Sequence, residues 1–108
     1  MLLELPFDIN QKVYVIANKK KMNTVGRVIT EKNKVVYSAT VIGYLLEKEN
    51  DQLCIIARLL VETDLRVSNT RSRPQNYCFV DEVKSCDCFA DKKAANGVLQ
   101  KMETQALE

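Results

Sequence analysis

The chain has 108 residues, of which 46% are hydrophobic and 28% charged, and its net charge is +2. These values predict one globular domain and exclude disorder of the whole chain. The absence of histidine excludes triads and dyads that need an imidazole and removes the commonest metal ligand. We expect a single domain over residues 1–106, because Leu107 and Glu108 match a junction often left before a purification tag.

The first residues, from Met1 to Pro6, include an acidic side chain and no long apolar run, which argues against a signal peptide. The chain has no run of about 18 apolar residues, so we expect no membrane span. A chain without an export signal is expected in the cytoplasm, where its four cysteines stay reduced.

Segments rich in β-branched and aromatic residues predict an antiparallel sheet of five to six strands. We expect strands over residues 12–17, 25–31, 34–47, 52–62, 65–68 and 77–83. A polar, basic loop over 18–24 follows the first segment, and the pairs Lys32–Asn33 and Thr63–Asp64 are predicted turns.

The two longest segments differ in their patterns. Neither face of 34–47 is cleanly polar, and Gly43 predicts a bulge or bend that switches which face is buried. The segment 52–62 alternates more strictly, which predicts an apolar face toward the core and a face with both charges toward water. The expected inward residues are Leu53, Ile55, Ala57, Leu59 and Val61.

The last segment has a helical period and predicts a helix over about residues 91–104. Its apolar stripe consists of Ala95, Val98, Leu99, Met102 and Ala106. Asp91 is a suitable N-cap, whereas Lys92 and Lys93 oppose the helix dipole and Gly97 weakens the helix interior. We therefore expect a helix that packs its stripe on the sheet as a lid over the core.

Taken together, these segments predict a mostly β fold, a small barrel or a strongly bent antiparallel sheet, with a C-terminal helix. The order of Phe7–Ile16, Ala39–Gly43, Cys88–Ala95 and then Leu99 resembles a group of small, uncharacterised bacterial and phage-associated proteins. The resemblance implies an SH3-like barrel with an appended helix and implies no activity. This chain departs from the pattern at Asn10, where a glycine is usual, and in an apparent insertion over residues 19–32.

Cysteines and acidic residues are the candidates for chemistry. Cys86 and Cys88 form one short pair, whereas structural zinc sites normally use two pairs with longer spacing, so we expect no metal and no cofactor. Asp81 and Glu82 have no histidine or glycine-rich phosphate loop to work with, so we expect strand-end charges and no enzyme activity.

Basic loops are the candidate contact region, and Tyr77 or Tyr37 is a candidate stacking residue. The basic residues are Lys19, Lys20, Lys21, Arg27, Arg71 and Arg73. We expect a non-catalytic interaction module that binds a protein or peptide, as a monomer or weak homodimer with no membrane partner. Nucleic-acid binding through the same loops is the alternative, and a structural protein of a mobile element, self-associating at an open strand edge, is the third reading.

Overall fold

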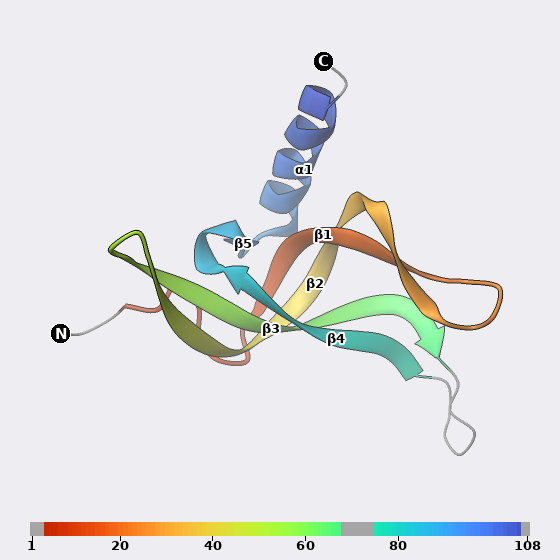
Figure 1. Ribbon diagram of the computed structural model, residues 1–108, viewed down its shortest axis with the longest axis horizontal. Coiled ribbons are helices and arrows are strands. Elements are labelled where there is room, and N and C mark those ends of the chain that lie inside the picture. Colours follow the sequence, from red (N-terminus) through yellow and green to blue (C-terminus); the bar gives the residue numbers. More distant parts are fainter. Residues whose placement is uncertain (1–3, 68–74, 107–108) are drawn as a thin grey trace.

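The computed structural model describes residues 4–67 and 75–106 and shows a mostly β fold that ends in one helix, as expected (Figure 1). The elements are β1 (Lys12–Met22), β2 (Val28–Glu49), β3 (Gln52–Val67), β4 (Gln75–Lys84), the 3-10 turn η1 (Ser85–Asp87), β5 (Cys88–Phe89) and α1 (Lys92–Ala106). The strands form one antiparallel sheet in the order β4-β3-β2-β1-β5.

The sheet is strongly bent and is not closed into a barrel. After β4 the chain crosses through η1 to the opposite edge, where β5 pairs with Tyr14 and Val15 of β1. β4 and β5 therefore form the two ends of the sheet. Of the two expected architectures, the bent sheet is the one observed.

Two predicted turns are irregularities within long strands. The segments 25–31 and 34–47 are joined in β2, where the pairing shifts from Asn18 with Lys34 to Lys20 with Thr30. Likewise Thr63 lies inside β3, and its buried hydroxyl donates to the Tyr77 carbonyl at 2.7 Å. Polar residues are common both at bulges and in turns, because in both places the backbone hydrogen bonds between strands are interrupted. The sequence alone therefore does not distinguish a bulge from a turn.

The basic segment over 18–24 is strand over most of its length, since β1 continues to Met22. The true turn follows it, where the Asn23 side chain accepts the amides of Val25 and Arg27 and Gly26 adopts a φ of 85°. Pairing with β2 satisfies the backbone of the lysines, which outweighs their weak preference for strands.

Gly43 lies at a bulge, as predicted. Val41 pairs with Leu59 and Gly43 pairs with Arg58, so Ile42 is an extra residue in β2. Val41 is buried before the bulge, and Tyr44 packs against the core after it. The buried face of β2 therefore changes from odd to even residue numbers at this point.

The core lies on one face of the sheet, called here the core face; the opposite side is the outer face. The buried residues of the core are Val13, Val15, Ala39, Val41, Ala57, Leu59, Val61 and Cys88. The inward pattern predicted for β3 is confirmed at Ala57, Leu59 and Val61. Leu53 is 54% exposed because the β2–β3 hairpin extends beyond the core.

The N-terminal segment is fastened to the core face. The Tyr44 hydroxyl accepts the Phe7 amide at 3.0 Å and donates to the Phe7 carbonyl at 2.7 Å. Asn10 has a φ of 73°, a conformation that glycine and asparagine adopt most readily, and its amide donates to the Val41 carbonyl. Asparagine thus serves at a position where the backbone adopts a conformation that most side chains avoid.

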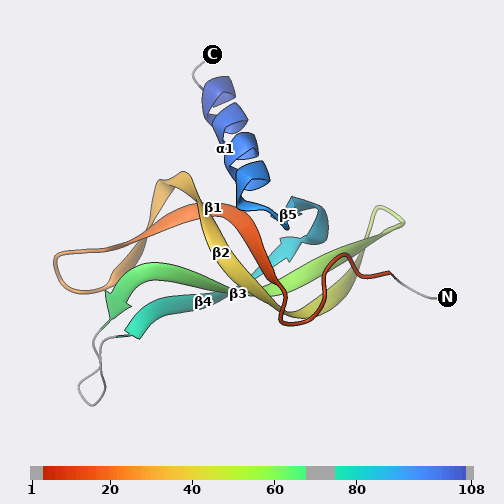
Figure 2. The ribbon, with the colours of Figure 1, turned by 180° about the vertical axis from the view of Figure 1, so that it is seen from behind.

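The helix does not form a lid, so this prediction is wrong. α1 contacts β1, β2 and β5 near its start and then projects away from the sheet (Figure 2). Ala95 is buried, whereas Val98 and Met102 are 39% and 38% exposed. The bent sheet and the N-terminal segment already cover the core, and Ala95 lies outside the core cluster. Asp91 accepts the Lys93 amide as the expected N-cap.

Replacing Leu59 by alanine is expected to lower the free energy of unfolding by roughly 2–5 kcal/mol, since the side chain is fully buried. Urea unfolding followed by circular dichroism measures this loss. Leu53→Ala, on the same strand and face, is the matched control and should change stability by no more than about 0.5 kcal/mol. Equal losses in the two variants would contradict the assigned core.

Candidate functional site

The structure gives Lys20 and Lys21, two of the three adjacent lysines predicted as contact residues, different partners. Lys20 Nζ lies 4.9 Å from the centre of the Phe79 ring and donates to Thr30 Oγ1 at 2.7 Å. Lys21 Nζ lies 3.5 Å from a carboxylate oxygen of Glu31. Two of the three ammonium groups therefore already have partners within the sheet.

Aromatic rings gather around Lys20 and form what we call the aromatic cluster: Tyr37, Phe79 and Tyr77. The Phe79 ring meets Tyr37 edge-on at 6.2 Å and is stacked with Tyr77 at 6.0 Å. The Tyr37 hydroxyl accepts the Lys20 amide at 2.7 Å. The structure thus brings two predicted residues, Lys20 and Tyr77, together through Phe79. Sequence analysis missed Phe79, although alternation along the strand places it on the same face as Tyr77.

Of the remaining basic candidates, Lys19 lines a hollow together with Lys20 and Tyr37. Arg27 lies in the β1–β2 turn, where its amide donates to Asn23 Oδ1 at 2.8 Å. Arg71 and Arg73 lie outside the described residues.

A hollow of about 480 Å³ lies mainly on the outer face. Its lining is Lys12, Tyr14, Lys19, Lys20, Val35, Val36, Tyr37, Ser38, Glu62, Thr63, Asp64, Leu65, Asn76 and Lys92. Tyr14, Ser38 and Glu62 lie directly opposite one another on three neighbouring strands and form its floor. Four lysines and two carboxylates line the hollow, so its charge is mixed with an excess of ammonium groups.

Cys88 is a buried thiol with little reactivity expected. Burial, together with the neighbouring Asp87, raises the pKa of Cys88 to about 11, and its Sγ donates to the Lys84 carbonyl at 3.7 Å. Cys86 is exposed. In the part of the chain that the structure describes, no three metal-ligating side chains are grouped.

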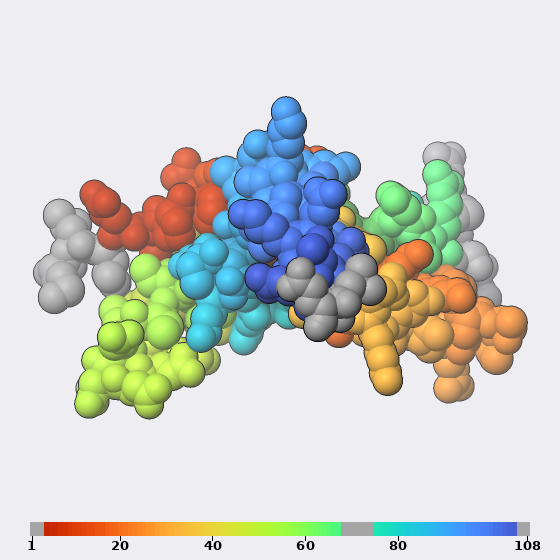
Figure 3. Space-filling view, turned by 90° about the horizontal axis from the view of Figure 1, so that it is seen from above, coloured from red at the N-terminus to blue at the C-terminus, as the bar shows by residue number. Residues whose placement is uncertain are grey.

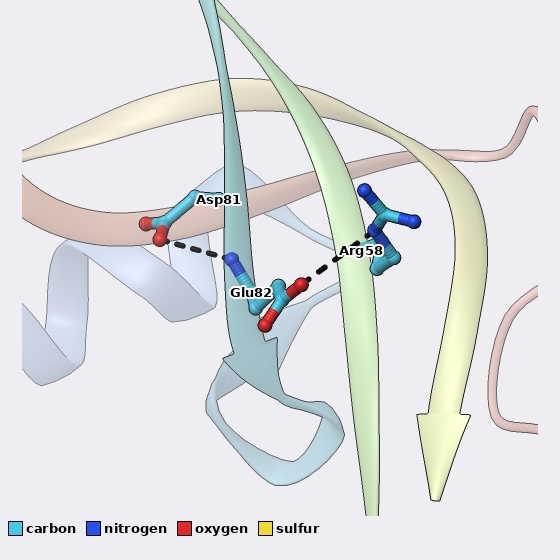
Figure 4. Close-up of polar contacts among 3 residues, drawn as sticks. All are labelled: Arg58, Asp81 and Glu82. Atoms are coloured by element: carbon cyan, nitrogen blue, oxygen red, sulfur yellow. Dashed lines mark hydrogen bonds and ion pairs between the residues drawn. The ribbon is translucent and has the colours of Figure 1, made fainter.

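Asp81 and Glu82 make structural contacts at the β4 end of the sheet (Figure 4). Asp81 Oδ1 accepts the Glu82 amide at 2.9 Å. A Glu82 carboxylate oxygen lies 3.7 Å from Arg58 Nε of β3, directly across the strand pair. Their carboxylates are thus engaged with the sheet itself.

The projecting helix offers an apolar surface that sequence analysis assigned to the core. Figure 3 shows α1 rising from the middle of the elongated sheet, between the two hairpin ends. Val98 and Met102 are substantially exposed and Leu99 is half-buried, although all three belong to the apolar stripe. None of the helices in the described ranges is long and apolar enough to cross a membrane.

Cys88 should make stability depend on pH. Its folded pKa lies above the value of about 8.5 for an unfolded cysteine, so folding favours the neutral thiol. That contribution is complete below about pH 8.5 and is lost as the pH rises to about 11. Urea unfolding at several pH values should show a steeper loss for the natural protein than for Cys88→Ala. Identical pH profiles would contradict the assigned burial.

The chain was compared with known proteins at three levels. It matches no protein-family model, no curated protein and no solved structure. The resemblance noted from its sequence therefore stays a prediction, and the function must be argued from the molecule alone.

Proposed function

We propose that the protein is a non-catalytic interaction module that binds another protein, with α1 as its main contact element. The observation that carries this proposal is the exposure of Val98 and Met102 on a helix that stands clear of the sheet. Val98 and Met102 lie at i and i+4, with Leu99 three residues before Met102, and this is the spacing by which helices dock into apolar grooves.

The energetics of α1 support a partner. Its first turn carries Lys92 and Lys93, which oppose the helix dipole, and Gly97 costs about 1 kcal/mol relative to alanine. A helix of 15 residues with only its start packed gains little from tertiary contacts. Covering the stripe would remove apolar surface from water and would stabilise the helix at the same time.

The strand order supports a finer description of the fold, an SH3-like barrel that is left open. The chain passes from β4 through η1 to β5, which lies on the far edge beside β1. Such a crossing would close a barrel if β4 and β5 met. Small barrels of this kind commonly serve as scaffolds for binding surfaces.

Nucleic-acid binding has weaker support. Lys20 and Lys21 have partners within the sheet, and Glu62 and Asp64 share the outer-face hollow with the other lysines. A surface that binds a phosphate backbone requires several basic side chains that can contact the phosphates. Glu62 and Asp64 interrupt the lysines of the hollow, which weakens its match to a continuous row of phosphates.

Selection of random 16-residue peptides by phage display on the immobilised protein tests the proposal. Enriched peptides should bind the natural protein and lose about tenfold or more in affinity, which is about 1.4 kcal/mol, toward Val98→Gln/Met102→Gln. Glutamine keeps the helix propensity and removes the apolar contact.

The matched control is Gln100→Ala/Thr104→Ala on the opposite face of the helix, which should retain the affinity. Peptides that bind all three proteins equally would contradict the role of α1. Salt-dependent binding of short single-stranded oligonucleotides, with no enrichment of any peptide, would favour the nucleic-acid alternative.

A further inference from the structure

β4 is the unpaired end of the sheet in the part of the chain described. Its ten residues pair with β3 on one side only. The Tyr77 carbonyl accepts the Thr63 hydroxyl of β3 and therefore points toward β3. Backbone directions alternate along a strand, so the amides and carbonyls of Asn76, Cys78, Val80 and Glu82 point to the free edge.

Asp81 occupies an unusual place on this strand. It lies opposite the buried Leu59, so its side chain is on the core face, between the half-buried Phe79 and Val83. From there Asp81 Oδ1 accepts the Glu82 amide at 2.9 Å (Figure 4). The carboxylate thus caps a donor of the free edge, and an inward charge on an edge strand is a known protection against strand addition.

We propose that the β4 edge is a strand-pairing surface for β4 of a second copy, and that Asp81 holds this surface closed. Antiparallel pairing about a two-fold axis requires opposed residues to lie on the same face of the joined sheet. A register centred on Val80 meets this requirement. It places Val80, which is 53% exposed, beside Val80 of the second copy.

The other pairs in this register are compatible. On the outer face Asn76 lies opposite Lys84 and Cys78 opposite Glu82, and on the core face Tyr77 lies opposite Val83. No charges of the same sign are opposed, and the exposed valine gains a contact.

Asp81 is the exception in this register. It falls opposite the Phe79 ring, where its charge loses water and where the nearby Lys20 ammonium already bonds Thr30 Oγ1. Asp81 also accepts the hydrogen bond of the Glu82 amide. In the paired sheet this amide would instead donate to the Cys78 carbonyl of the second copy. These two effects act on each copy, so removing one side chain should release both halves of the interface.

Sedimentation velocity of Asp81→Ala tests the proposal. The variant is made in a protein that also carries Val98→Gln and Met102→Gln, so that contacts through α1 do not contribute. We expect the dimer dissociation constant to fall at least about tenfold relative to the same protein with Asp81. Circular dichroism and thermal unfolding establish that both proteins are folded.

Two variants separate the carboxylate's roles. Asp81→Asn keeps an oxygen that accepts the Glu82 amide but lacks the charge, and it should associate more weakly than Asp81→Ala. Asp87→Ala removes the same charge from η1, away from the edge, and should leave association unchanged. Association that rises equally in Asp87→Ala would show an effect of net charge alone and would overturn the proposal.

A disulfide reports the register. Val80→Cys is combined with Asp81→Ala and with Cys78→Ser, which leaves one thiol at the edge. Mild oxidation should give a covalent dimer faster than in the matching protein that keeps Asp81. A dimer that fails to cross-link at position 80, or sedimentation unchanged by Asp81→Ala, would overturn the proposal. Either result leaves the proposed role of α1 untouched.

Discussion

The rest of the fold depends on one extra residue, Ile42, in the longest strand. Its insertion changes the parity of β2, so that Val41 and Tyr44 both face the core although they are three residues apart. Tyr44 then reaches the Phe7 backbone and holds the N-terminal segment over the core face. Without the bulge, the Tyr44 side chain would point to the outer face and one side of the core would be uncovered.

Because the N-terminal segment covers the core face, most of α1 is not needed to cover the core. The core face is buried by the curvature of the sheet, by the N-terminal segment and by β5, which contributes Cys88. Among the described side chains of α1 only Ala95 is buried, and it lies outside the core cluster. Val98 and Met102 of the apolar stripe thus remain substantially exposed, which is the basis of the proposed role of α1 in binding.

Much of the fold could be predicted from local patterns. Strict alternation identified Ala57, Leu59 and Val61 as inward residues, and Gly43 identified the bulge. The turns expected at Lys32–Asn33 and Thr63–Asp64 could not be separated from bulges, because polar residues suit both. The position of the helix relative to the sheet also could not be predicted. A stripe shows which side chains avoid water and does not show what covers them.

The candidate site was predictable only in part, because the contacts between its residues depend on how distant strands pair. Tyr77 and Lys20 were identified by their chemistry, and the structure joins them through Phe79. The separation of Lys20 from Lys21 follows from strand alternation and was hidden by the expectation of a loop. The contact between Asp81 and Glu82 acquires meaning only once β4 is known to be an edge, which depends on pairing between distant segments.

The two edges of the sheet differ in the contacts that they could make with a second copy of the chain. β5 covers β1 only at Tyr14 and Val15, and the exposed continuation of β1 carries lysines, whereas β4 carries Asp81 and Glu82. Pairing of β1 in one copy with β4 in the next would be head-to-tail and would give a ring or an open filament, whereas pairing of β4 with β4 stops at a dimer. Glu82 is held by Arg58 and Lys21 by Glu31, so the charges that would favour the open-ended contact are already engaged. The carboxylate of Asp81 therefore restrains an edge contact that is self-limiting, whereas Glu82 and Lys21 are engaged in ion pairs within the chain.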